Sequence, residues 1–137
     1  MTTYLLCGDR NWDDYSAALT VATCIAIEPN AAVIHGNARG ADRLAGAACA
    51  QLGIPVRAYP AQWELYGRRA GPIRNQQMLI DGKPDIVIYF HDNLEASKGT
   101  ADMVRRARRA GLQVYSWQEY VHLVSDVLAE MERFDVS

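Results

Sequence analysis

The chain has 137 residues, of which 50% are hydrophobic, and its 14 basic and 16 acidic side chains give a formal net charge of −2. This length is typical of one domain, and the apolar content suffices for one continuous core, so we expect a single domain over residues 1–137. The near balance of charge excludes a global field that would hold nucleic acid and leaves any such contact to a local patch.

The length of the apolar segments and the number and spacing of the cysteines indicate the cellular location of the protein. The longest apolar stretches, such as residues 86–90, are too short to cross a bilayer, and the amino terminus lacks the regions of a signal peptide. Cys7, Cys24 and Cys49 are odd in number, lie in apolar surroundings and are never spaced as CxxC. We therefore expect a cytoplasmic protein with no membrane contact, reduced cysteines and neither a disulfide nor a zinc framework.

The amino-terminal half alternates short apolar runs with segments whose apolar residues follow helical spacing. Asp13 or Asp14 suits the cap of the first helix, and Gly53 ends the second. The predicted strands are residues 4–7, 31–34 and 54–59, and the predicted helices are residues 13–27 and 40–52.

The second half begins with residues 60–71, a connection long enough to be a candidate functional loop. Pro72 suits the first position of the helix that follows. The nearly continuous apolar run 84–90 predicts a central strand buried on both faces. The remaining predicted elements are helices at residues 72–81, 97–110 (capped by Ser97 or Thr100) and 117–133, and an edge strand at residues 112–115.

This alternation is typical of βαβ units and predicts an α/β fold, a single Rossmann-like three-layer domain with a mainly parallel five-stranded sheet. Because crossovers between parallel strands are right-handed, the turn after every strand emerges at one edge of the sheet. Open α/β sheets bind ligands at this carboxyl edge, where the strand order reverses. We therefore expect the functional site there.

Three turns at that edge combine glycine with polar residues: residues 8–10 (GDR), residues 35–42 (HGNARGAD) and residues 97–100 (SKGT). Glycine lets the backbone approach an anion, and the first N–H groups of the following helix bind it. Tight turning alone is the alternative for any one turn, but three together predict a phosphate site. With neither GxGxxG nor GK[ST] present, no NAD or NTPase chemistry is indicated, and we expect no cofactor. The candidate ligand-binding residues are Gly8, Arg10, Gly36, Arg39, Gly40, Asp42, Arg74, Asn75, Gly99 and Thr100.

The charged side chains of the first two turns have two interpretations each. Asp42 either caps backbone N–H groups or accepts a hydrogen bond from a ribose hydroxyl. Arg10 and Arg39 either bind phosphate in bidentate fashion or pair with Asp9 or Asp42.

Arg74 and Asn75 are predicted in the first turn of a helix, where a cation is unfavourable against the helix dipole. A ligand anion or a carboxylate near Arg74 would explain this placement, and Asn75 would then read a base or ribose. Trp63 and Tyr66, in the preceding loop, either stack on a base or pack onto the core.

His35 and His91 both end strands and suggest a metal site, but no third ligand stands at a convincing spacing, so we expect hydrogen-bonding roles and no metal. The last helix carries more apolar residues than a cap requires, which is explained by a homo-oligomer or by core packing. Four arginines of the preceding helix form either a solvated face or a nucleic-acid contact; they are Arg105, Arg106, Arg108 and Arg109.

Four phrases, VIHGNARGADRLA, YPAQWELYGRRAGPIRNQQML, DIVIYFHDN and SKGTADMVRRARRAGLQVY, resemble the YspA-type branch of the SLOG superfamily, known from actinobacteria and their phages. The resemblance extends from Leu5 to Tyr115. That superfamily also includes DprA, the LOG phosphoribohydrolases and sensor domains for nucleotide derivatives. The resemblance thus implies a Rossmann-like fold with a nucleotide-related ligand at the strand ends.

In this resemblance HGNARGAD matches the first glycine-rich ligand loop, and SKGTADM is similar to the LOG motif PGGxGTxxE. Met103 stands where LOG enzymes have their catalytic glutamate, and Asp102 could replace it only on a rotated helix. The resemblance therefore implies a module that senses or sequesters a nucleotide derivative. The alternatives are a LOG-like hydrolase of the N-glycosidic bond of nucleoside monophosphates, using Asp102 and Arg74, and a DprA-like protein that binds DNA.

Overall fold

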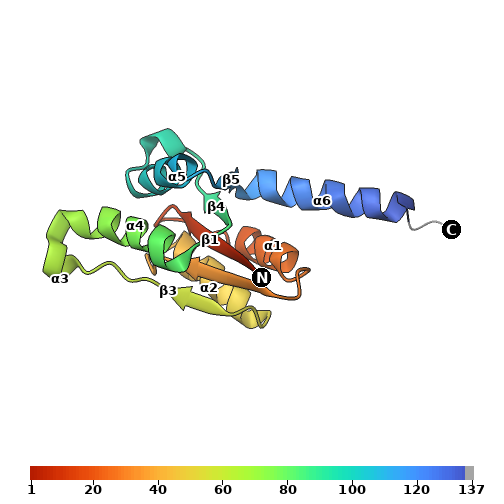
Figure 1. Cartoon of the computed structure of the whole chain (residues 1–137), viewed down its shortest axis with the longest axis horizontal. Helices are drawn as coiled ribbons and strands as arrows, with labels where there is room; N and C mark the ends of the chain where they lie inside the picture. The colour runs from red at the N-terminus through yellow and green to blue at the C-terminus, as the bar shows by residue number, and fades with distance from the viewer. Residues whose placement is uncertain (135–137) are drawn as a thin grey trace.

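The structure is a computed structural model that describes residues 1–134. Helices and strands alternate along the chain (Figure 1). The elements are β1 (Thr2–Gly8), α1 (Tyr15–Ile25), β2 (Ala31–His35), α2 (Ala41–Gln51), β3 (Val56–Ala58), α3 (Trp63–Tyr66), the 3-10 turn η1 (Gly67–Arg69), α4 (Ala70–Gly82), β4 (Ile86–Phe90), the 3-10 turn η2 (Leu94–Ala96), α5 (Gly99–Arg109), β5 (Gln113–Ser116) and α6 (Trp117–Phe134).

The five strands form one sheet in the order β3-β2-β1-β4-β5, and every neighbouring pair is parallel. Leu6 of β1 stands beside His35 of β2, and Gly8 beside Phe90 of β4. The chain moves outward from β1 to β2 and β3, then returns to β4 on the other side of β1. The strand order thus reverses between β1 and β4, and the predicted α/β fold with a parallel five-stranded sheet is confirmed.

Helices cover both faces of the sheet. Side chains alternate between the two faces along each strand, so each strand contributes residues to both sides of the core. Tyr4 and Leu6 of β1 are buried in a cluster with residues of α1, α2 and α6. Leu5 and Cys7 are buried on the opposite face with residues of α4 and α5. The fold therefore has three layers with the sheet in the middle.

Local hydrogen bonds decide where two helices begin. Asp14, not Asp13, caps α1, because its carboxylate accepts the N–H of Ala17. At the start of α5 the Ser97 hydroxyl accepts the N–H of Thr100 over 3.0 Å. Both contacts satisfy N–H groups that a first helical turn leaves without partners.

The connection after β3 differs from the predicted loop, since it contains α3 and η1, and α4 begins at Ala70. Pro72 is thus the third residue of α4, where its missing N–H costs no hydrogen bond. Arg74 is the fifth residue and Asn75 the sixth. The prediction that both lie in the first turn, against the helix dipole, is therefore wrong.

Helix α6 extends beyond the body of the molecule (Figure 1). Its first half packs on the core: Tyr120 is buried, and its ring meets that of Tyr4 edge-on with centroids 5.8 Å apart. No helix within residues 1–134 is long and apolar enough to cross a membrane. The large exposed apolar side chains of α6 are Leu123, Val127, Leu128, Met131 and Phe134.

Candidate functional site

The turn after β1 lies where the strand order reverses, and it is tightly packed. The Asp9 N–H donates to the carbonyl of Phe90 over 2.8 Å, and the Asp9 carbonyl accepts the N–H of Ala41 over 3.0 Å. A Cβ at Gly8 would overlap the Phe90 carbonyl and the Ala41 side chain. Glycine is therefore required here for the close approach of β1, β4 and the start of α2.

The loop of residues 35–42 folds around the carboxylate of Asp42, which is buried. This carboxylate accepts the N–H groups of Gly36 over 3.1 Å and of Ala38 over 3.2 Å. Burial raises the pKa of Asp42 to about 6, although the two N–H groups and the nearby Arg74 oppose the shift. Asp42 thus anchors the loop from inside, while its contact with a ribose stays a prediction.

The outer part of this loop meets the turn of residues 8–10. Gly40 has a φ of 80°, and a Cβ there would overlap the backbone of Arg10. The Arg39 guanidinium donates to Asn11 Oδ1 over 3.3 Å and is exposed, as is Arg10. Within residues 1–134 neither arginine forms an ion pair, so the alternative of pairing with Asp9 or Asp42 is not realised.

Arg74 reaches from α4 to this same loop. Its Nη1 donates to the carbonyl of Gly36 and, over 3.4 Å, to that of Tyr59. A Cβ at Gly36 would overlap the guanidinium, so the absence of a side chain there admits Arg74. Burial lowers the pKa of Arg74. Across the described part of the chain Arg74 has no carboxylate within ion-pair distance, which leaves a half-buried cation at the edge of the sheet.

Asn75, the next residue, is buried and points to the start of α5. Its Nδ2 donates to the carbonyl of Gly99 over 3.3 Å and to Oδ2 of Asp102 over 3.0 Å. Arg74 and Asn75 therefore lie between residues 35–42 and residues 97–103 and contact both. The structure brings together six of the predicted site residues, namely Gly36, Asp42, Arg74, Asn75, Gly99 and Asp102.

Asp102 and Met103 face different surroundings on α5. Asp102 lies toward α4 and also accepts the Nε–H of Arg106 over 2.9 Å. Met103 is 1% exposed and belongs to the core with Val87 and Met78. The position that resembles the catalytic glutamate of LOG enzymes is thus a core position. The carboxylate of the preceding residue, Asp102, is held by the Asn75 amide and by two arginines, Arg105 and Arg106.

The two strand-end histidines do not meet, because β1 lies between β2 and β4. Nδ1 of His35 accepts the N–H of Asn37 over 2.9 Å, and burial lowers the pKa of His35. Nδ1 of His91 accepts the N–H of Asn93 over 3.0 Å. Each imidazole therefore holds its own turn, and within residues 1–134 no group of three His, Cys, Asp or Glu is arranged to hold a metal ion.

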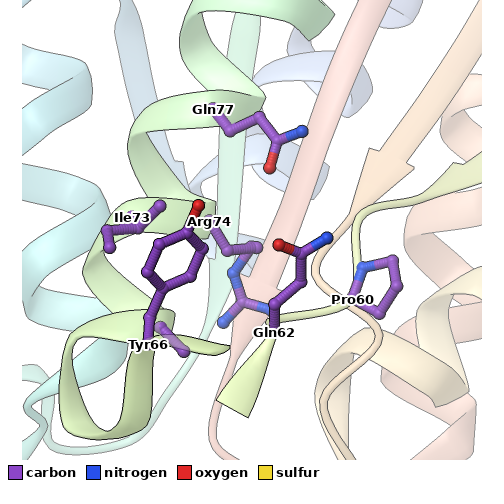
Figure 2. Close-up of a pocket in the computed structure, with 7 residues that line it drawn as sticks. Pro60, Gln62, Tyr66, Ile73, Arg74 and Gln77 are labelled. Atoms are coloured by element: carbon purple, nitrogen blue, oxygen red, sulfur yellow. The ribbon is translucent and has the colours of Figure 1, made fainter. Parts of the chain in front are cut away.

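A recess opens between the segment after β3 and helix α4 (Figure 2). Trp63 is 59% exposed and Tyr66 is 43% exposed. Neither aromatic is therefore buried in the core, although packing onto the core was one of the two predicted alternatives. Sequence reasoning missed Gln62 and Gln77. The spacing of three residues between Arg74 and Gln77 puts them on one helix face and could have identified the second glutamine. The recess is lined by Pro60, Gln62, Tyr66, Ala70, Ile73, Arg74 and Gln77.

Comparison with known proteins identifies relatives by sequence. The profile of the YspA, cpYpsA-related SLOG family matches residues 4–66. The Gene 61 protein of Mycobacterium phage D29 is 32% identical over 127 residues, which cover 85% of this chain and 97% of that protein.

Solved structures share the fold at lower identity. DNA processing protein A from Streptococcus pneumoniae has a TM-score of 0.63 at 18% identity, over 85% of this chain and 50% of that one. TM1055 has a TM-score of 0.63 at 17% identity, over 83% of this chain and 72% of that one. MurG from Acinetobacter baumannii has a TM-score of 0.54 at 14% identity, over 85% of this chain and 34% of that one. This chain therefore spans half the length of DNA processing protein A.

Proposed function

Because this chain belongs to the YspA, cpYpsA-related SLOG family, we propose that it binds a nucleotide or nucleotide-derived ligand at the carboxyl edge of its sheet. The observation that carries the proposal is the position of Arg74 and Asn75 between the loop of residues 35–42 and the start of α5. Within residues 1–134 this half-buried guanidinium has no carboxylate within ion-pair distance, which favours an anionic ligand beside it.

The N–H groups of the two loops differ in what they offer to a phosphate. In the loop of residues 35–42 the N–H groups of Gly36, Asn37 and Ala38 already donate to side chains of the same loop. The first turn of α5, by contrast, leaves N–H groups without intrahelical acceptors, and the Cα of Gly99 faces open space. We therefore place the phosphate at the start of α5, with Arg10 and Arg39 supplying positive charge from the neighbouring turns.

Calorimetric titration with a panel of nucleoside 5′-monophosphates tests this proposal. Arg39→Ala removes an exposed charge, so the fold should persist while affinity falls about tenfold, the effect of one charge-assisted hydrogen bond. Arg133→Ala, a matched loss of charge at the far end of α6, should leave affinity unchanged. If no nucleotide binds the wild-type protein and no nucleotide derivative copurifies with it in mass spectrometry, the proposal is wrong.

Hydrolysis of the N-glycosidic bond is a second candidate, which the contact between Asp102 and Asn75 supports, since it holds a carboxylate against the residue that follows Arg74. In that reaction Asp102 would stabilise positive charge that develops on the sugar. Release of free base from nucleoside monophosphates, lost in Asp102→Asn, would establish it. Absence of base release from every monophosphate tested leaves binding alone.

DNA binding is a third candidate, because Arg105, Arg108 and Arg109 are exposed along α5, whereas Arg106 contacts Asp102 and Gln76. Retention on DNA that falls steeply as salt is raised would support it, since phosphate contacts release counterions. Equal retention by the wild-type protein and an Arg108→Ala/Arg109→Ala variant would contradict it.

We also propose that α6 pairs with α6 of a second copy of the chain. Its apolar side chains recur at alternating spacings of four and three residues, which is the pattern of two helices that pack along one seam. Tyr120 is buried in the core, and Val124 packs partly against it. The stripe then continues with Val127, Met131 and Phe134, which are exposed within residues 1–134. The stripe consists of Tyr120, Val124, Val127, Met131 and Phe134.

A further inference from the structure

Asp42 is a buried acid on the inner side of the loop of residues 35–42. Its Oδ2 accepts the N–H of Gly36 over 3.1 Å and also the N–H of Ala38 over 3.2 Å. Because both bonds end on Oδ2, Oδ1 can carry a proton while the loop keeps both contacts. Protonation of Asp42 therefore changes the charge behind the loop without removing the hydrogen bonds that hold it.

Gly36 joins this acid to Arg74. The N–H of Gly36 donates to Asp42, and its carbonyl accepts a hydrogen bond from Nη1 of Arg74. Within residues 1–134 the two charged groups are not within ion-pair distance of each other. Burial is the largest influence on the pKa of both groups, and the charge of each opposes that influence on the other. The carboxylate and the guanidinium are thus electrostatically coupled through one intervening residue.

Other ionisable groups surround Asp42. Arg43 of α2, like Arg74 of α4, favours the charged carboxylate, and Cys7 of β1 stays neutral because burial raises the pKa of its thiol. His35, at the start of the same loop, has its pKa lowered by burial and then by the two arginines. For Asp42 itself burial prevails and raises the pKa to about 6. Two groups of this cluster, Asp42 and His35, therefore change charge as the solution is acidified.

We propose that Asp42 controls the affinity of the site without touching the ligand, by taking up a proton when an anion binds beside Arg74. This inference rests on the proposed function, because it concerns the regulation of the same site. A charged Asp42 repels the anion and competes with it for Arg74, whereas a protonated Asp42 does neither. Since proton and anion then favour each other's binding, the protein binds its ligand more tightly in mildly acidic than in neutral solution.

Calorimetric titration of the wild-type protein and Asp42→Asn with a nucleoside 5′-monophosphate, at a series of pH values, tests this coupling. The asparagine keeps an oxygen for both N–H groups and is neutral, like the protonated acid. For a coupling of about tenfold, Asp42→Asn should bind about tenfold more tightly than the wild-type protein at about pH 7.5 and equally at about pH 5. The phosphate of the ligand also titrates near pH 6, but equally with both proteins, so its effect cancels in the ratio of affinities.

His35→Asn is the control for the second titrating group. Its amide oxygen can replace Nδ1 as the acceptor of the Asn37 N–H, but it cannot take up a proton. We expect this variant to keep the wild-type dependence of affinity on pH. Loss of that dependence in His35→Asn would assign the coupling to the histidine and overturn the role of Asp42.

A ¹³C NMR titration of the Asp42 carboxyl group in the wild-type protein measures the same coupling without a variant. The pKa of Asp42 should be higher with saturating monophosphate than without it. The inference is overturned if the ligand leaves this pKa unchanged, if the ratio of affinities does not vary with pH, or if Asp42→Asn weakens binding at every pH, as a direct contact with the ligand would require. In each of these outcomes the proposed function stands. Failure of the wild-type protein to bind any monophosphate overturns the proposed function and this inference together.

Discussion

The side-chain amide of Asn75 donates to the carboxylate of Asp102 over 3.0 Å and thereby ties α4 to the first turns of α5. The same amide reaches the Gly99 carbonyl. This pair sets the distance between Arg74 and the start of α5, the two parts of the structure to which we assign ligand binding. The first prediction therefore concerns this contact.

Asn75→Ala should lower the free energy of unfolding by about 1–3 kcal/mol, because it leaves buried polar partners unsatisfied. Gln118→Ala, at an exposed position of α6, should change it by less than about 0.5 kcal/mol. Urea denaturation measures both. Asn75→Asp should cost more than Asn75→Ala at neutral pH, because two carboxylates then face each other, and Asp102→Asn should reverse the added loss. Equal stability of Asn75→Asp and Asn75→Ala would contradict this account.

The buried carboxylate of Asp42 should make stability depend on pH. Its pKa rises from a usual value of 3.8 to about 6 in the folded chain, so between these values the folded protein holds a proton that the unfolded chain has lost. Stability from this group is complete below about pH 4 and is lost as pH rises through 6. The loss amounts to about 3 kcal/mol for a shift of this size.

The variant Asp42→Asn isolates this effect. His35, whose pKa is lowered by burial, acts in the opposite direction by destabilising the fold as pH falls, but it is common to both proteins and cancels in their difference. The free energy of unfolding of the wild-type protein minus that of Asp42→Asn should therefore decrease from pH 4 to pH 7. A difference that stays constant over this range would show that Asp42 ionises normally.

Gly36 should tolerate no side chain while Arg74 is present. Gly36→Ala places a Cβ against the guanidinium, and such overpacking typically costs about 1–3 kcal/mol. Arg74→Ala should recover part of that loss in the double variant, which the double-mutant cycle measures by urea denaturation. Gly99→Ala is the control, since a Cβ there meets no atom within 4 Å. Additive losses in the cycle would refute the proposed contact.

The exposed stripe of α6 should hold two chains together. We expect the wild-type protein to run as a dimer in size-exclusion chromatography with light scattering, and Met131→Glu to run as a monomer, because it puts a charge into an apolar seam. Ala129→Glu adds the same charge outside the stripe and should stay dimeric. A wild-type protein that is monomeric at every concentration would eliminate this pairing.

Much of the fold could be predicted because its determinants are local in sequence. Alternating apolar runs specify β1, β2 and β4, and apolar residues at helical spacing specify α1, α2 and α5. The boundaries of α4 were predicted less well, since Pro72 is compatible with several positions in a first turn. The turns that gather at the carboxyl edge followed from the handedness of parallel crossovers.

What the site residues contact was decided only by the tertiary structure, because the partners are remote in sequence. Arg74 lies 38 residues from the Gly36 carbonyl, and Asn75 lies 27 residues from Asp102. No local pattern could show that Asp42 turns inward or that Tyr66 stays exposed beside Arg74. Nor could it show that the apolar stripe of α6 continues beyond the part of the helix that packs on the core. By itself, then, the sequence determined the elements, their order and the edge where the loops meet. Packing between distant segments determined which side chains at that edge and along α6 are held by contacts within the fold and which stay exposed.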